Sequence, residues 1–145
     1  MPLGPKPLGV GIDVLSWKRT QRFLASHSFL LIDRLLAPSE QTLLKNAADP
    51  VSVFARLFTA KEAAMKAFGD SWVEEGRFRQ IEILMGDQDQ FRVSVRPKNK
   101  KGAVPKKGDR PLFSALFSEA EGSFFKTPNG IGARLVLWSK EGSSS

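Results

Sequence analysis

Residues 54–69 read FARLFTAKEAAMKAFG, and this stretch decides the fold. Its large apolar residues recur at i, i+3 and i+4, which is the period of a helix that packs one face on a core. These residues are Phe54, Leu57, Phe58, Met65 and Phe68. The spacing therefore predicts one long amphipathic helix at the centre of the fold.

Three charged residues depart from this pattern. Lys61 falls within the apolar stripe, whereas Glu62 and Lys66 form an i, i+4 pair on its flank. In a structural interpretation, Lys61 extends along apolar neighbours to reach solvent, and the pair contributes about 0.2–0.5 kcal/mol. In a functional interpretation, a carboxylate between two ammonium groups beside a buried face is suited to a metal-bound phosphate. The helix alone does not decide between them.

The stretch GVGIDV, residues 9–14, is the second feature that bears on this question. Val10, Ile12 and Val14 alternate with Gly9, Gly11 and Asp13, which predicts a strand whose glycines allow close packing against its backbone. Asp13 then lies on the face opposite the β-branched residues. Alternatively, Asp13 caps the helix that follows.

Composition limits the classes of protein to be considered. A chain of 145 residues with 41% hydrophobic residues predicts a single domain. The absence of cysteine excludes disulfides and thiolate sites, and a single histidine, His27, excludes a multi-histidine site and reads as a surface residue in a turn. Without a signal peptide or a long apolar run, we expect a soluble, cytoplasmic protein. The net charge of +7 predicts a polyanionic partner.

The remaining elements follow from local signals. We expect an irregular arm over residues 1–8, a folded domain over 9–140 and a flexible tail over 141–145. A helix begins near Ser16 and another at Pro38. Predicted strands cover residues 78–85, 91–95, 111–117 and 132–138, the first two forming a hairpin.

The segment 98–110 contains six Lys or Arg residues among prolines and glycines. It reads as a solvated, mobile loop, because no aromatic residue is interleaved to stack on bases. A small basic nucleic-acid-binding domain is the alternative, and it leaves Asp13 and the Lys61–Glu62–Lys66 group without a role.

Several motifs together resemble the 4'-phosphopantetheinyl transferases, and by length the single-domain holo-[acyl-carrier-protein] synthase type. They are GVGIDV at 9–14, RLLAPSEQTLL at 34–44, FTAKEAAMK at 58–66 and GRFRQIEIL at 76–84, followed by a C-terminal strand. The resemblance extends from Gly9 to Trp138. It implies an α+β single domain in which an antiparallel sheet packs against a long central helix.

The resemblance also implies a chemistry. Members transfer the phosphopantetheine arm of coenzyme A to a serine of an acyl carrier protein, with Mg2+ as cofactor. Asp13 and Glu62 match metal ligands of the family, and Glu62 is also the candidate base for the serine proton. Lys66 matches a lysine directed at the phosphates, with Lys61 adding charge beside it. Asp13, Glu62 and Lys66 are therefore the expected catalytic residues.

Partner contacts are implied in the same way. Arg19 matches a basic position that binds the acidic carrier protein, assisted by Lys18 and Arg22. For coenzyme A we expect contacts from Lys61, Lys66, Arg56 and Ser114. The family's small members are homotrimers with the active site between subunits, so a homotrimer is expected, with neither nucleic acid nor membrane as partner.

Two positions depart from the family pattern. Leu57 stands where the family has arginine, with Arg56 one residue earlier. The residues Ser114, Ala115, Leu116 and Phe117 stand where the family has a serine-x-serine/threonine-histidine element. A hypothesis is that Lys106, Lys107 or Arg110 contacts the 3'-phosphate instead. A catalytically impaired relative that only binds carrier protein or coenzyme A is the alternative function.

Overall fold

The computed structural model describes residues 4, 6–69, 77–95 and 117–139. Five strands form one antiparallel sheet in the order β1-β5-β4-β3-β2. The strands are β1 (Pro7–Ser16), β2 (Ile81–Met85), β3 (Gln90–Val95), β4 (Phe117–Thr127) and β5 (Gly130–Ser139). The helices are α1 (Trp17–Ser26), α2 (Phe29–Leu35), α3 (Pro38–Lys45), α4 (Pro50–Phe68) and α5 (Arg77–Gln80). The predicted α+β class is confirmed.

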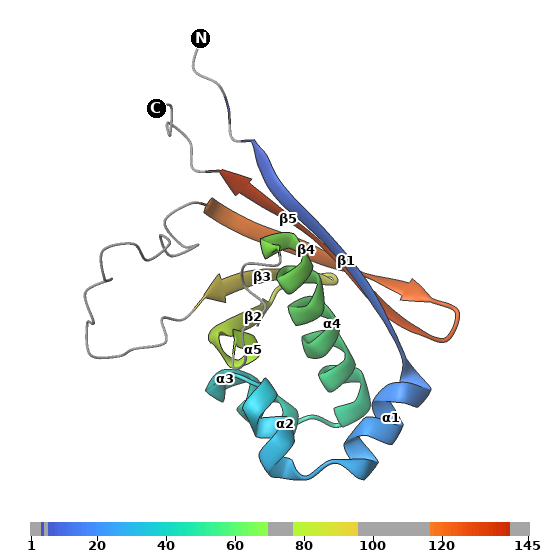
Figure 1. The fold of residues 1–145 in the computed structure, drawn as a ribbon. Helices are drawn as coiled ribbons and strands as arrows, with labels where there is room; N and C mark the ends of the chain where they lie inside the picture. Colours follow the sequence, from blue (N-terminus) through green and yellow to red (C-terminus); the bar gives the residue numbers. More distant parts are fainter. Residues whose placement is uncertain (1–3, 5, 70–76, 96–116, 140–145) are drawn as a thin grey trace, which may run out of the picture.

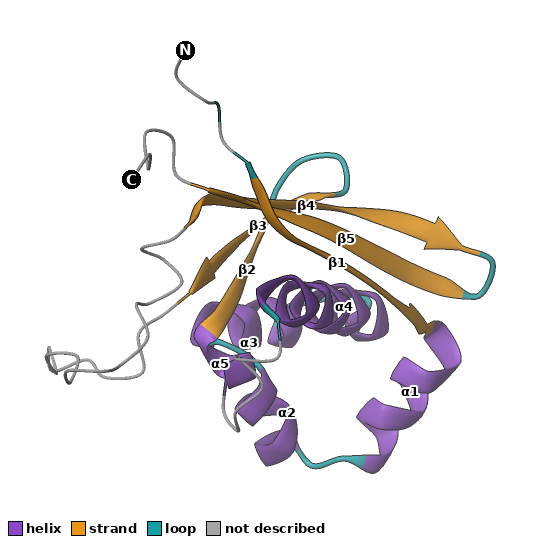
Figure 2. Cartoon of the chain, turned by 45° about the horizontal axis from the view of Figure 1, so that its top comes forward, coloured by secondary structure: helices purple, strands orange, loops and turns teal. Residues whose placement is uncertain are grey.

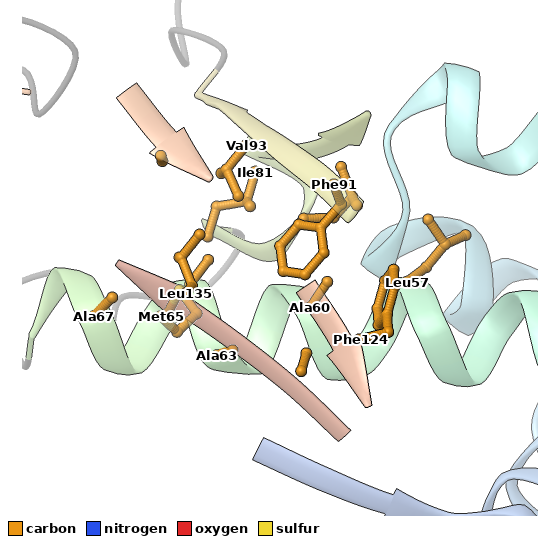
Figure 3. Close-up of a cluster of buried hydrophobic side chains, with 14 of the residues drawn as sticks. Leu57, Ala60, Ala63, Met65, Ala67, Ile81, Phe91, Val93, Phe124 and Leu135 are labelled. Carbon is orange, nitrogen blue, oxygen red and sulfur yellow. The ribbon is translucent and has the colours of Figure 1, made fainter. Parts of the chain in front are cut away.

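The helices lie on one face of the sheet, and no helix of the described residues covers the other face (Figures 1 and 2). The long helix α4 runs under β1 and β5, with α1, α2, α3 and α5 around it. Figure 3 shows Leu57 and Ala60 of α4 beside Phe91 and Phe124, which come from β3 and β4. The core thus forms between one sheet face and α4, as the apolar stripe predicted. Within the described part of the chain, no helix is long and apolar enough to cross a membrane.

Two glycines determine how closely β1 approaches α4. A Cβ added to Gly9 would lie 2.1 Å from the carbonyl oxygen of Ala67, and one added to Gly11 would lie 1.8 Å from that of Ala63. Only glycine allows this contact between the two backbones. The prediction that an element packs close to the glycines is confirmed, and the strand begins at Pro7, two residues before its predicted start.

The caps of two helices explain where they begin. Ser16 caps α1 by accepting a hydrogen bond from the backbone N–H of Arg19 at 3.1 Å, so the interpretation of Asp13 as a cap is wrong. Asp49 caps α4 in the same way, and Pro50 occupies the first turn of that helix. His27 is exposed at the end of α1, as predicted, with its ring stacked on Phe23.

One ion pair is buried in the core. The side chains of Lys61 and Glu40 are 0% and 1% exposed and contact each other through Nζ and Oε1. Lys61 also donates hydrogen bonds to the carbonyl oxygens of Leu35 and Phe78, at 2.9 and 2.7 Å. The prediction that Lys61 extends to solvent is therefore wrong, because a buried carboxylate and two carbonyl groups satisfy its ammonium inside the protein.

The strands differ from the prediction in two places. Residues 77–80 form the short helix α5. Of the predicted strand over 78–85, only residues 81–85 form a strand, which is β2. Strand β4 covers most of a segment for which no strand was predicted, and of the predicted strand over 111–117 only Phe117 lies within the described residues. Gly122 interrupts the apolar pattern of β4 because a Cβ there would lie 2.2 Å from the ring of Phe91.

Candidate metal and phosphate site

The site begins with an ion pair between β1 and α4. Lys66 Nζ donates to Asp13 Oδ1 at 2.9 Å and to the carbonyl oxygen of Ile12 at 3.1 Å. The side chain of Asp13 is 19% exposed and that of Lys66 is 53% exposed. Lys66 therefore pairs with an aspartate 53 residues away in sequence, a contact that the i, i+4 spacing could not show. The flexible, half-exposed lysine is free to move when a ligand enters.

Glu62 is the second carboxylate of this cluster. Burial raises the pKa of Glu62 above its ordinary value, the negative charge of Asp13 raises it further, and the positive charge of Lys66 lowers it. Asp13 and Glu62 thus lie close enough for their charges to repel each other. A cation bound between them would relieve this repulsion.

The donor set of this cluster fits Mg2+. Among the described residues no group of three or more His, Cys, Asp or Glu side chains is placed to hold a metal, and the cluster itself offers the two carboxylates of Asp13 and Glu62. Mg2+ is usually held by one or two carboxylates together with substrate phosphates and water. Asp13 and Glu62 are the residues that would hold it, and Lys66 would meet a phosphate bound beside it.

Comparison with known proteins identifies the family. The model of the 4'-phosphopantetheinyl transferase superfamily matches residues 9–115, which include β1, α4 and all three residues of the cluster. The chain belongs to this superfamily.

Individual relatives agree with the superfamily assignment. A holo-[acyl-carrier-protein] synthase from Blochmanniella pennsylvanica is 37% identical over 76 residues, covering 52% of this chain and 61% of the relative. The holo-[acyl-carrier-protein] synthase structure from Neisseria meningitidis has a TM-score of 0.72 and 26% identity, covering 91% of this chain and 98% of that one. The Helicobacter pylori structure, described as a complex with coenzyme A, shares the fold with a TM-score of 0.61, 22% identity, and coverage of 88% and 98%. The chain spans 49% to 64% of the length of the first three curated relatives that it matches.

The other residues expected at coenzyme A are not gathered at this cluster. The contact expected from Lys61 is wrong, because its buried ammonium is turned toward Glu40. Arg56 pairs with Asp89 at 3.3 Å and lies over the ring of Phe124. Ser114 and the basic segment 98–110 lie outside the described residues. The charged cluster between β1 and α4 therefore consists, among the described residues, of Asp13, Glu62 and Lys66.

The basic face of α1 lies next to the end of β1 that carries Asp13. Lys18, Arg19 and Arg22 are all exposed, and within the described ranges none of them pairs with a carboxylate. These three cations are accessible to a partner, and their contact with a carrier protein stays a prediction.

Two features of this superfamily member were not predicted from the sequence. Glu40, in the RLLAPSEQTLL motif, is the buried partner of Lys61, and its carboxylate also accepts from the backbone N–H groups of Ala37 and Ile83, each at 2.7 Å. Thr59, one turn before Glu62, is wholly buried, and its hydroxyl has no hydrogen-bond partner among the described residues. The motif match alone pointed to the Glu40 segment, and no signal in the sequence singled out Thr59.

Proposed function

We propose that this protein transfers the 4'-phosphopantetheine arm of coenzyme A to a serine hydroxyl of an apo acyl carrier protein in the cytoplasm. The products are the holo carrier protein and adenosine 3',5'-bisphosphate. The main support for this proposal is that Asp13 of β1 lies beside Glu62 and Lys66 of α4. Membership of the superfamily and the coenzyme A complex of the Helicobacter pylori relative support it.

In the proposed reaction the serine oxygen attacks the phosphorus that carries the pantetheine arm. An O–P bond forms to the serine, and the bond from that phosphorus to the bridging oxygen breaks, so that the bridging oxygen leaves with the adenosine bisphosphate. Glu62 is the candidate acceptor of the serine proton, because a carboxylate beside the reacting groups can act as a general base. Bound Mg2+ supplies Lewis-acid stabilisation of the charge on the diphosphate.

Asp13 and Lys66 have distinct parts in this proposal. Asp13 would hold the metal together with Glu62. Lys66 would leave Asp13 and turn its ammonium to the phosphates, because a positively charged metal replaces it as the counter-ion of that carboxylate. Its exposure leaves this side chain room to move. Arg56 and Ser114 remain proposed contacts of the nucleotide.

The exposed cations Lys18, Arg19 and Arg22 support a docking site for an acidic carrier protein. Contacts between exposed charges mainly steer association and weaken as salt increases. Such contacts suit a partner that must bind, receive the arm and leave. We therefore propose that this face of α1 presents the carrier serine to the nearby carboxylates.

The uncovered face of the sheet supports the proposed homotrimer. Leu8, Val10, Ile12 and Val14 of β1 are each more than half exposed on or beside it. Leu84 and Met85 add apolar surface at the end of β2 and line the same hollow as Val10 and Ile12. Contiguous apolar surface of this kind is typical of an interface between subunits. Analytical ultracentrifugation tests it: a single species with the mass of one chain would exclude the trimer.

The transfer itself is tested by incubating the protein with apo carrier protein, coenzyme A and Mg2+ and following the release of adenosine 3',5'-bisphosphate by chromatography. Release that requires the carrier protein and stops when the metal is chelated is expected. A folded sample that binds carrier protein or coenzyme A without releasing the bisphosphate would instead indicate the catalytically impaired relative.

A further inference from the structure

Thr59 is the one buried side-chain polar group without a hydrogen-bond partner among the described residues. It lies within α4 and is 0% exposed. A threonine in a helix ordinarily donates to the carbonyl oxygen four residues earlier. Thr20 does so to Ser16 at 2.9 Å and Thr42 to Pro38 at 3.2 Å, whereas Thr59 does not. A buried hydroxyl without a partner costs folding free energy, so it calls for an explanation.

The position of Thr59 on α4 relates it to the metal and phosphate site. Glu62 follows it by three residues and Lys66 by seven, so the three side chains share one face of the helix. The hydroxyl is therefore on the same side of α4 as both charged groups of the site.

The register between β1 and α4 brings Thr59 opposite Asp13. Gly9 contacts Ala67 and Gly11 contacts Ala63, so two residues along β1 correspond to four along α4. The two steps have nearly the same length, since two strand residues rise about 6.6 Å and four helical residues about 6 Å. Continuing this register by two residues along β1 and four along α4 places Asp13 opposite Thr59. Lys66, about two turns after Thr59 on α4, reaches the same carboxylate through its long side chain.

We propose that Thr59 is a positioning residue of this site, whose hydroxyl donates a hydrogen bond to the carboxylate of Asp13 when a divalent cation is bound. The proposal rests on the proposed function, because it requires that Asp13 hold the cation. In the structure Lys66 donates to one oxygen of Asp13, and the hydroxyl of Thr59 has no partner among the described residues. When Lys66 turns to phosphate, the hydroxyl replaces it as a donor and orients the carboxylate, as outer partners of metal ligands commonly do.

The test uses Thr59→Val, which keeps the shape and removes the hydroxyl, and Thr59→Ser, which keeps the hydroxyl. Thr42→Val is the matched control, because Thr42 is an exposed threonine on α3. Mg2+ affinity is measured calorimetrically with MgCl2 on protein saturated with coenzyme A. Thermal unfolding is measured without metal, and transfer to carrier protein is followed in parallel.

We expect Thr59→Val to weaken Mg2+ affinity about 10-fold, the lower end of the range for outer partners of metal ligands. Its unfolding temperature without metal should equal or exceed that of the wild type, because an unpaired buried hydroxyl has been removed. Thr59→Ser should restore the affinity, and Thr42→Val should leave it unchanged.

Three outcomes would overturn the proposal. If Thr59→Val lowers the metal-free unfolding temperature and leaves Mg2+ affinity intact, the hydroxyl has a structural role only. If neither quantity changes, the hydroxyl serves no role at the site. If the wild-type protein itself shows no Mg2+ binding and no transfer, the proposed function fails as well. The first two outcomes differ from this one because in them the wild type still binds Mg2+ and transfers the arm.

Discussion

Replacing Lys61 by methionine should destabilise the protein severely, because the change leaves the carboxylate of Glu40 buried without its cation. Both side chains are essentially inaccessible to solvent, and Lys61 also satisfies the carbonyl oxygens of Leu35 and Phe78. Breaking a buried pair by removing one partner costs about 3–5 kcal/mol. This is a large share of the roughly 5–15 kcal/mol that stabilises a typical domain.

At about 2–4 °C per kcal/mol for a chain of this size, the melting temperature of Lys61→Met should fall by about 6–20 °C. Thermal and urea unfolding followed by circular dichroism measure it. Lys45→Met is the matched control, since Lys45 is exposed at the end of α3 and should change stability by no more than about 0.5 kcal/mol.

The penalty should also depend on pH. Burial raises the pKa of Glu40, whereas the charge and hydrogen bond of Lys61 lower it. Without Lys61 the pKa of Glu40 rises further. An acid with a raised native pKa contributes stability below its unfolded pKa and loses it as pH rises through the native pKa. The deficit of Lys61→Met should therefore shrink as pH falls toward the unfolded pKa of glutamate. A loss as small as that of Lys45→Met, or one independent of pH, would refute this reasoning.

Three further predictions concern the strand–helix contact, the site and the carrier surface. Gly11→Ala should cost about 3 kcal/mol or more in urea unfolding, because its Cβ would lie 1.8 Å from a backbone carbonyl oxygen of α4, whereas Gly4→Ala, with open space around it, should be neutral. Without metal, the stability of the protein should fall as pH rises through the raised pKa of Glu62. Thermal melts of Glu62→Gln should not show this decline, and a decline that persists in the variant would assign it to another group. Arg19→Glu should raise KM for carrier protein and leave coenzyme A affinity unchanged, whereas equal effects on both would place Arg19 elsewhere.

The central helix and the glycine strand could be predicted because their signals are local. The apolar spacing of α4 and the alternation of glycine with β-branched residues in β1 each reflect a single buried face. Strand β4 was missed because Gly122 weakens its strand pattern. A glycine is needed there to leave space for the ring of Phe91, which comes from the neighbouring strand β3 and cannot be placed from the local sequence. The short helix α5 was missed because four residues are too few to show a helical period.

The candidate site could be predicted only in part, for a related reason. Asp13, Glu62 and Lys66 carry charges in recognisable motifs, so the sequence pointed to them. Lys61 was misassigned because a lysine in an apolar stripe looks the same whether it reaches solvent or meets a buried acid. That acid, Glu40, lies 21 residues earlier, and only the packing of α3 on α4 brings it there.

Intact-mass spectrometry of an apo acyl carrier protein, incubated with coenzyme A, Mg2+ and each of four proteins, tests the role of the two carboxylates directly. The proteins are the wild type, Asp13→Asn, Glu62→Gln and the control Asp87→Asn, whose carboxylate lies in the exposed turn between β2 and β3. The wild type and the control should add one phosphopantetheine to the carrier at equal rates. The two site variants should be slower by at least about 100-fold, the lower end of the contribution of a general base. Transfer by either site variant at the wild-type rate would contradict the assignment of Asp13 and Glu62 to the reaction.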